Sequence, residues 1–137
     1  MFRRMLATID RIAPARTAHA HCDLMCGVYN PAQARIEAES VKACAEKYQA
    51  SDDPVFRQRA ITIKEERAEL VKHHLSVLWT DYFKPPHVEQ FPELHDLFWR
   101  AIKAAGDAKK SVDPADGQAL LDLIDEIDVI FTKTKQG

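Results

Sequence analysis

The sequence predicts an all-α protein: an antiparallel four-helix bundle preceded by an irregular N-terminal hook. Only four glycines occur in 137 residues, and the first of them is Gly27. Few breakers among many Ala, Leu, Glu and Lys residues favour helix over sheet. Three pairs, Asn30-Pro31, Asp53-Pro54 and Asp113-Pro114, place a capping residue before a proline. Such pairs are typical helix starts, because the cap accepts a free backbone N–H and proline has none to satisfy.

The first helix is expected roughly over residues 31–48 and the second over 54–82, where Lys84-Pro85-Pro86 ends it. The third starts near Pro92, with Gly106 near its end, and the fourth follows Pro114. Short connections favour antiparallel neighbours. The expected inward positions, at mostly helical spacing, are Ile36, Val41, Cys44 and Tyr48; Phe56, Ala60, Ile63, Leu70, Leu75, Leu78 and Tyr82; Leu94, Leu97, Phe98 and Ile102; and Leu120, Ile124, Ile127 and Phe131.

The first twenty residues differ in charge from the rest of the chain. They carry four Arg, no Lys and one Asp, a formal charge of +3, whereas the remainder carries −5. This contrast suggests a processed leader or a flexible arm. Because the hook chemistry described below needs a free amine at His21, we expect residues 1–20 to be a propeptide removed on maturation, residues 21–29 to be the hook, and residues 30–137 to be the bundle.

Composition limits the partners and the compartment. A net charge of −2 gives no general case for binding nucleic acid or an anionic membrane, and no stretch approaches the roughly 20 apolar residues of a membrane span. Ala18-His19-Ala20 resembles a secretory cleavage site, but the apolar run over residues 5–9 is too short and Asp10-Arg11 interrupts it. We expect a cytoplasmic protein, although the leader's composition alone also fits a transit peptide.

Cysteine usage singles out the hook. Three cysteines are too few for a disulfide scaffold, and Cys44, inside a helical pattern, is expected to be a small buried hydrophobe. Cys22 and Cys26 form a C-x-x-x-C pair. Alone, that pair fits a redox couple, half of a zinc site or two unrelated thiols. No second pair is present to complete a four-cysteine zinc set.

The pair acquires a specific chemistry if the chain begins at His21. The free amine of His21 and the amide nitrogen of Cys22 then form one five-membered chelate ring, and that amide nitrogen and the Cys22 thiolate form another. Cys26 can return to add a second thiolate. Two nitrogens and two sulfurs in a plane suit Ni(II), with the His21 imidazole within reach of an axial position. None of this works while Ala20 is attached, because the His21 nitrogen is then an amide.

The stretch HCDLMCGVYNPAQARIEAES, residues 21–40, closely resembles the nickel hook at the mature start of nickel-containing superoxide dismutases. The similarity continues through residues 63–70, 72–74 and 79–87, and covers nearly all of residues 21–137, weakening toward the end. The resemblance implies an oxidoreductase that converts two superoxide radicals into dioxygen and hydrogen peroxide, with one nickel ion per subunit alternating between Ni(II) and Ni(III). It also implies a homohexamer and a processing peptidase as partners.

The same resemblance implies roles for particular residues. His21, Cys22 and Cys26 are the expected metal ligands. Glu37 and Arg67 match residues that orient the His21 ring, Asp23 shapes the hook, and Tyr29 and Tyr82 match tyrosines that guard the approach of the small anion. Without that role, Glu37 and Arg67 would be an interhelix ion pair and the tyrosines packing residues. For His73 and His74 we expect surface or interhelix packing.

Two residues depart from the family pattern. Asn30 replaces the usual Asp, and since both cap helices, little should change. Met25 replaces the usual Pro, whose preceding peptide bond is cis in the family. A cis bond before methionine costs about 2.5–4 kcal/mol, against roughly 0.5–1 before proline. Either metal chelation offsets that cost or the hook follows a different path.

Two other classes compete with this reading. One is a non-catalytic helical module that senses thiol redox state or metal with the same hook. The other is a ferritin-like di-metal bundle, which needs Glu-x-x-His on two helices. No Glu in this chain has a His three positions later, so the ferritin-like class is set aside.

Overall fold

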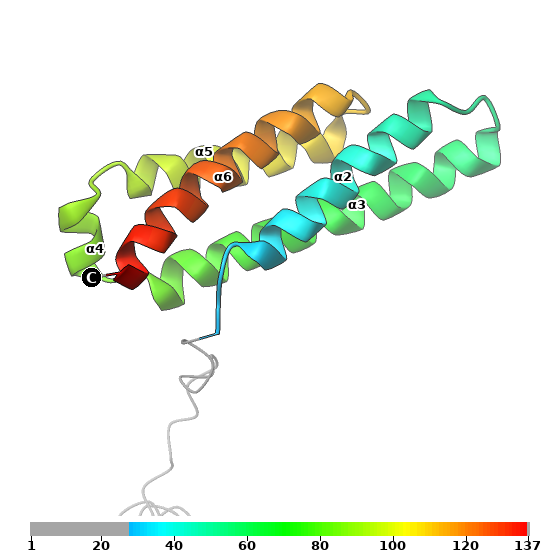
Figure 1. The fold of residues 1–137 in the computed structure, drawn as a ribbon. Helices are drawn as coiled ribbons and strands as arrows, with labels where there is room; N and C mark the ends of the chain where they lie inside the picture. Colours follow the sequence, from blue (N-terminus) through cyan, green and yellow to red (C-terminus); the bar gives the residue numbers. More distant parts are fainter. Residues whose placement is uncertain (1–27, 137) are drawn as a thin grey trace, which may run out of the picture.

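The computed structural model describes residues 28–136, and their regular structure is entirely helical (Figure 1). Four long helices form the bundle: α2 packs against α3 and α6, and α5 packs against the same two helices. The antiparallel four-helix bundle is therefore confirmed. The elements in chain order are α2 (Ala32–Gln49), α3 (Pro54–Val77), the π-helical turn η2 (Leu78–Tyr82), α4 (Pro85–Gln90), α5 (Leu94–Lys110) and α6 (Pro114–Gln136).

The three expected start signals work as side-chain caps. Asn30 Oδ1 accepts the backbone N–H of Ala32 at 2.8 Å, although the helix begins one residue later than predicted. Asp53 Oδ1 accepts the N–H of Val55 and Asp113 Oδ1 that of Ala115, each at 2.9 Å. Each bond satisfies one of the free N–H groups at a helix start.

The segment after the second helix differs from expectation. The second helix reaches Tyr82 as predicted, its last five residues being η2. The prolines that end it also begin α4, because proline is tolerated in a first helical turn. The third helix continues past Gly106 to Lys110. One glycine costs a helix only about 1 kcal/mol, and burial of Ala105 and Ala108 on either side of it outweighs that cost.

The core predictions are correct for α6 and, except for the half-buried Ile102, for α5, but they are mostly wrong for α2 and α3. Of the expected residues on α2 and α3, four are exposed: Ile36 by 60%, Phe56 by 38%, Ile63 by 40% and Leu70 by 36%. Cys44 and Tyr48 are only half-buried. Small side chains on the adjoining faces let α2 and α3 pack closely, and this leaves the larger side chains outside. The buried residues of these two helices are Ala34, Ala38, Val41 and Ala45 on α2, and Ala60, Lys64, Ala68, Val71 and Leu75 on α3.

Lys64 is the one buried charged residue in the described part of the chain, with 2% of its surface exposed. Its ammonium group donates to the carbonyl oxygen of Ala108 at 2.8 Å and to that of Lys109. These carbonyls belong to the last turn of α5, where backbone acceptors lack partners within the helix. Burial lowers the pKa of Lys64, while the negative charge of Glu65 opposes the shift. Lys64 therefore joins α3 to the end of α5.

Candidate functional site

The predicted metal ligands His21, Cys22 and Cys26, together with Asp23 and Met25, lie outside the described residues. The remaining predicted site residues, Tyr29, Glu37, Arg67 and Tyr82, are all described. In residues 28–136, no group of three or more His, Cys, Asp or Glu side chains is arranged to hold a metal ion.

Three elements meet where the described chain begins. α2 starts near the end of the bundle at which η2 and α6 finish (Figure 1). Asn30 and Pro31 line a hollow of about 280 Å³ together with Phe131 of α6. Phe131 also contacts Tyr82, with ring centroids 4.6 Å apart, and Tyr29 packs half-buried against the core. The fold therefore brings Tyr82 to the end of the bundle that the hook segment precedes.

Tyr82 is held by several neighbours. Its hydroxyl lies 2.8 Å from Thr134 Oγ1 of α6. Its ring stacks on His87 of α4 at 5.6 Å and 15° between planes, and the Lys135 ammonium lies 4.9 Å from the ring centroid. The sequence analysis did not identify Thr134 or Lys135. A polar pair in the last turn of a helix carries no local signal that a residue 52 positions away lies beside it.

Glu37 of α2 and Arg67 of α3 form an ion pair across the bundle, with Arg67 Nη1 3.2 Å from Glu37 Oε2 and 3.5 Å from Oε1. The Glu37 side chain is 15% exposed and that of Arg67 42%. His74 lies close enough for Glu37 to raise its pKa, but burial, which is the larger effect, and His73 lower it. The structure places the two residues that were expected to orient the His21 ring in contact with each other. An ion pair with only a structural role would have the same geometry.

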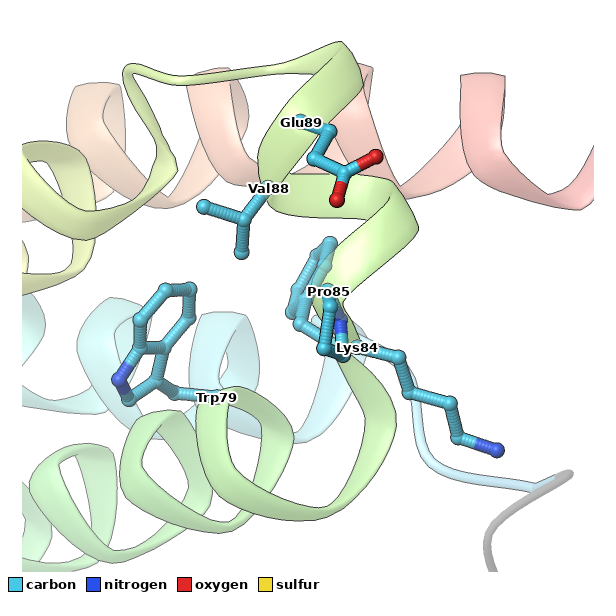
Figure 2. A pocket seen from close by; sticks show the side chains of 6 residues that line it. Trp79, Lys84, Pro85, Val88 and Glu89 are labelled. Carbon is cyan, nitrogen blue, oxygen red and sulfur yellow. The ribbon is translucent and has the colours of Figure 1, made fainter.

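A larger hollow lies between η2 and α4. Trp79, Phe83, Lys84, Pro85, Val88 and Glu89 line this space of about 480 Å³. Figure 2 shows Trp79 and Val88 facing each other from the two elements, with the Lys84 side chain extending away from the indole. Two further contacts hold this region: His87 Nδ1 accepts the Lys84 N–H at 3.1 Å, and the Trp79 ring packs on Phe98. The walls are mainly aromatic and aliphatic, and none of the lining residues was predicted to act at the site.

The donor set of the hook is read from the sequence, and its chemistry fits nickel. Cys22 and Cys26 offer two thiolates, and His21 offers an imidazole and, at a chain start, an amine. Such sulfur and nitrogen donors suit a planar Ni(II) site. Cys44, the one other cysteine, lies within α2 and lines a groove between α2 and α3.

Comparisons with known proteins agree with this assignment. The family model described as nickel-containing superoxide dismutase matches residues 16–135. The chain is 64% identical over 125 residues to a superoxide dismutase (Ni) of Streptomyces coelicolor, covering 91% of this chain and 95% of that protein.

Three crystal structures of nickel superoxide dismutase variants share the fold. In the first of these structures, the histidine that is numbered as residue 1 is replaced by alanine. That protein is 64% identical to this chain, with a TM-score of 0.77, and the match covers 78% of this chain and 98% of the other. In the second structure, an aspartate two positions after that histidine is substituted. In the third, a tyrosine eight positions after the histidine is substituted. Each of these two is 63% identical, with a TM-score of 0.83, over 85% of this chain and 100% of its own.

The four-helix bundle and the donor set in the sequence together define the class of protein, an α-helical metalloenzyme. The chain belongs to the nickel-containing superoxide dismutase family. It is an oxidoreductase with a nickel cofactor, and it converts superoxide into dioxygen and hydrogen peroxide. Within residues 28–136, the helices are too short or too polar to cross a membrane.

Proposed function

We propose that the active enzyme is a processed chain that begins at His21 and holds one nickel ion through His21, Cys22 and Cys26. The observation that carries the proposal is the donor set, because only removal of Ala20 turns the His21 nitrogen into a metal-binding amine. When bound, the metal supplies one-electron chemistry by alternating between Ni(II) and Ni(III). The protein must hold the ligands, admit a small anion and exclude competing reactions.

Two comparisons support cleavage before His21. His21, Asp23 and Tyr29 have the spacing of the histidine, aspartate and tyrosine exchanged in the three solved variants, where the histidine is numbered first. In addition, two of those chains are matched in full by 85% of this chain. About 15% of this chain is therefore left unmatched, and a leader of twenty residues would make up the same fraction of 137 residues.

The other predicted site residues, Asp23 among them, have assignable roles around the metal. Glu37, mostly buried and paired with Arg67, can accept a hydrogen bond from the His21 imidazole and so fix its orientation, as partners of metal-bound histidines commonly do. Arg67 holds the Glu37 carboxylate in place. Asp23 shapes the hook, and Tyr29 and Tyr82 flank the approach of superoxide.

Cleavage is tested by co-expressing the full chain with a processing peptidase, the partner that maturation requires. Intact mass and N-terminal sequencing of the active protein should give a chain that starts at His21. A matched control carries Ala20 as its first residue, and this chain should keep its helical content but lose nickel and activity. Dismutase activity from the Ala20-initiated chain would contradict the proposal.

We further propose that the processed chain assembles as a homohexamer, and that α2 and α3 supply a contact between copies. Phe56, Ile63 and Leu70 follow one another at seven-residue intervals on the exposed side of α3. Phe56 and Ile63 line, together with Cys44 and Arg67, a groove of about 570 Å³. An exposed apolar surface of this kind is typical of a protein–protein contact. An interface here would also cover Arg67, and so would shield the ion pair with Glu37 from water.

The cytoplasm is the proposed location of the mature enzyme. The support is the leader itself, which lacks the continuous apolar core of a secretory signal.

A further inference from the structure

The direction of the Tyr82 hydroxyl is fixed by a short chain of hydrogen bonds. Thr134 Oγ1 lies 2.6 Å from the carbonyl oxygen of Phe131, which can only accept, so the threonine hydroxyl donates its one proton there. Thr134 Oγ1 is then an acceptor toward Tyr82, whose hydroxyl lies 2.8 Å away. The phenol proton of Tyr82 therefore points to Thr134.

The ring of Tyr82 is fixed as well as its hydroxyl. His87 stacks on it, and His87 is itself held because its Nδ1 accepts the backbone N–H of Lys84. Phe131 packs against the ring at 4.6 Å, and the Lys135 ammonium lies over it at 4.9 Å. Contacts from α4 and from the last turns of α6 thus leave the phenol little freedom to rotate.

We propose that Thr134 is a positioning residue for Tyr82: it engages the phenol proton, so that Tyr82 offers lone pairs rather than a proton to a molecule at the approach. This inference rests on the proposed place of Tyr82 beside the approach to the metal. Superoxide is an anion without a proton and cannot donate a hydrogen bond to those lone pairs. Water and hydrogen peroxide can donate. Tyr82 therefore binds a water molecule or the departing product and does not hold the substrate anion.

Removal of the threonine hydroxyl is predicted to strengthen anion binding rather than to weaken it. In Thr134→Val the shape of the side chain is kept, but the phenol proton of Tyr82 is released and can bind anions. Azide, an anionic probe that only accepts hydrogen bonds, should then inhibit the processed, nickel-loaded enzyme at least roughly tenfold more tightly, the effect of one hydrogen bond to a charged group. KM for superoxide should fall, because the substrate anion gains a hydrogen-bond donor in this variant. Thr134→Ser should restore wild-type values.

A second measurement does not depend on activity or on nickel. The tyrosine doublet in the Raman spectrum reports whether a phenol donates or accepts a hydrogen bond. The Tyr82 contribution is isolated by subtracting the spectrum of Tyr82→Phe, which leaves only Tyr29 and Tyr48. The isolated doublet should be that of a donor in the wild type and in Thr134→Ser, and should change in Thr134→Val.

The outcomes separate this inference from the proposed function. An unchanged doublet in Thr134→Val, or azide inhibition that stays the same or weakens while nickel content is normal, overturns the role of Thr134. A changed doublet, combined with wild-type kinetics and azide inhibition in Tyr82→Phe, leaves the hydrogen bond in place but refutes the position of Tyr82 beside the approach.

Discussion

At the scale of single residues, the three cysteines have different surroundings. Cys22 and Cys26 stand in the hook sequence beside His21, whereas Cys44 lies half-buried within α2. Cys22→Ser and Cys26→Ser should each lose nickel and dismutase activity together, because each removes a thiolate. Cys44→Ala should keep both and cost only packing. Metal analysis and activity of the purified proteins decide this, and loss of nickel from a folded Cys44→Ala protein would show that the ligands are wrongly assigned.

His74 gives stability a pH dependence with a definite sign. Burial, aided by His73, lowers its pKa, and Glu37 from α2 only partly opposes the shift. The folded protein therefore binds fewer protons at His74 than the unfolded chain, whose histidine has a pKa of about 6.5. The contribution of His74 to stability is complete above that pH and is lost as the pH falls through the lowered pKa.

His74→Gln should consequently make the free energy of unfolding less sensitive to pH below about 6.5, where the unfolded chain binds a proton at His74 more readily than the folded protein does. Urea unfolding of the full chain at several pH values measures this slope. The neighbouring His73→Gln is the control and should change the slope less, because His73 is exposed. An equal effect of both substitutions would show that burial of His74 is not the cause.

At the scale of helices, two glycines within helices provide a matched pair. A Cβ at Gly117 of α6 would lie 2.8 Å from Cα and Cβ of Lys42 on α2, whereas one at Gly106 of α5 would meet only the end of the Lys72 side chain at 3.7 Å. Gly117→Ala should destabilise the fold by about 1–3 kcal/mol, because two helix backbones must move apart. Gly106→Ala should stabilise it by up to about 1 kcal/mol, because alanine favours helix.

Thermal and urea unfolding of both variants distinguish packing from propensity. If the two alanines changed stability by the same amount and in the same direction, close approach of α2 and α6 at Gly117 would not be the determining factor. Circular dichroism should show the same helical content in both proteins, since neither substitution removes a cap or a backbone hydrogen bond.

At the scale of the whole molecule, the proposed contact between subunits involves the exposed apolar residues Phe56, Ile63 and Leu70 of α3. Ile63→Lys should reduce the proposed hexamer to smaller species, because burying an unpaired ammonium group at an interface is strongly unfavourable. Val129→Lys is the control, since Val129 is 55% exposed on α6, away from the groove. Light scattering of the processed, nickel-loaded proteins measures the change. A hexamer that persists in Ile63→Lys, or that is lost only in Val129→Lys, would place the contact elsewhere.

Helix starts could be read from the sequence because their physics is local. Asp53 and Asp113 cap a backbone N–H two residues ahead, so the bond needs no distant partner. The extra helix α4 was missed for a related reason: two prolines can end one helix and begin another. The sequence alone does not say which of these happens.

By itself, the sequence determined the helical bundle, the charge contrast of the leader and the donor set of the hook, since each depends on neighbouring residues or on composition. Only the tertiary structure decided which face of α2 and α3 is buried, because the choice of an alanine face over Ile36, Phe56 and Ile63 depends on how closely the two helices pack. It also placed Thr134 beside Tyr82, an arrangement that exists only after distant helices have packed and that no local pattern encodes.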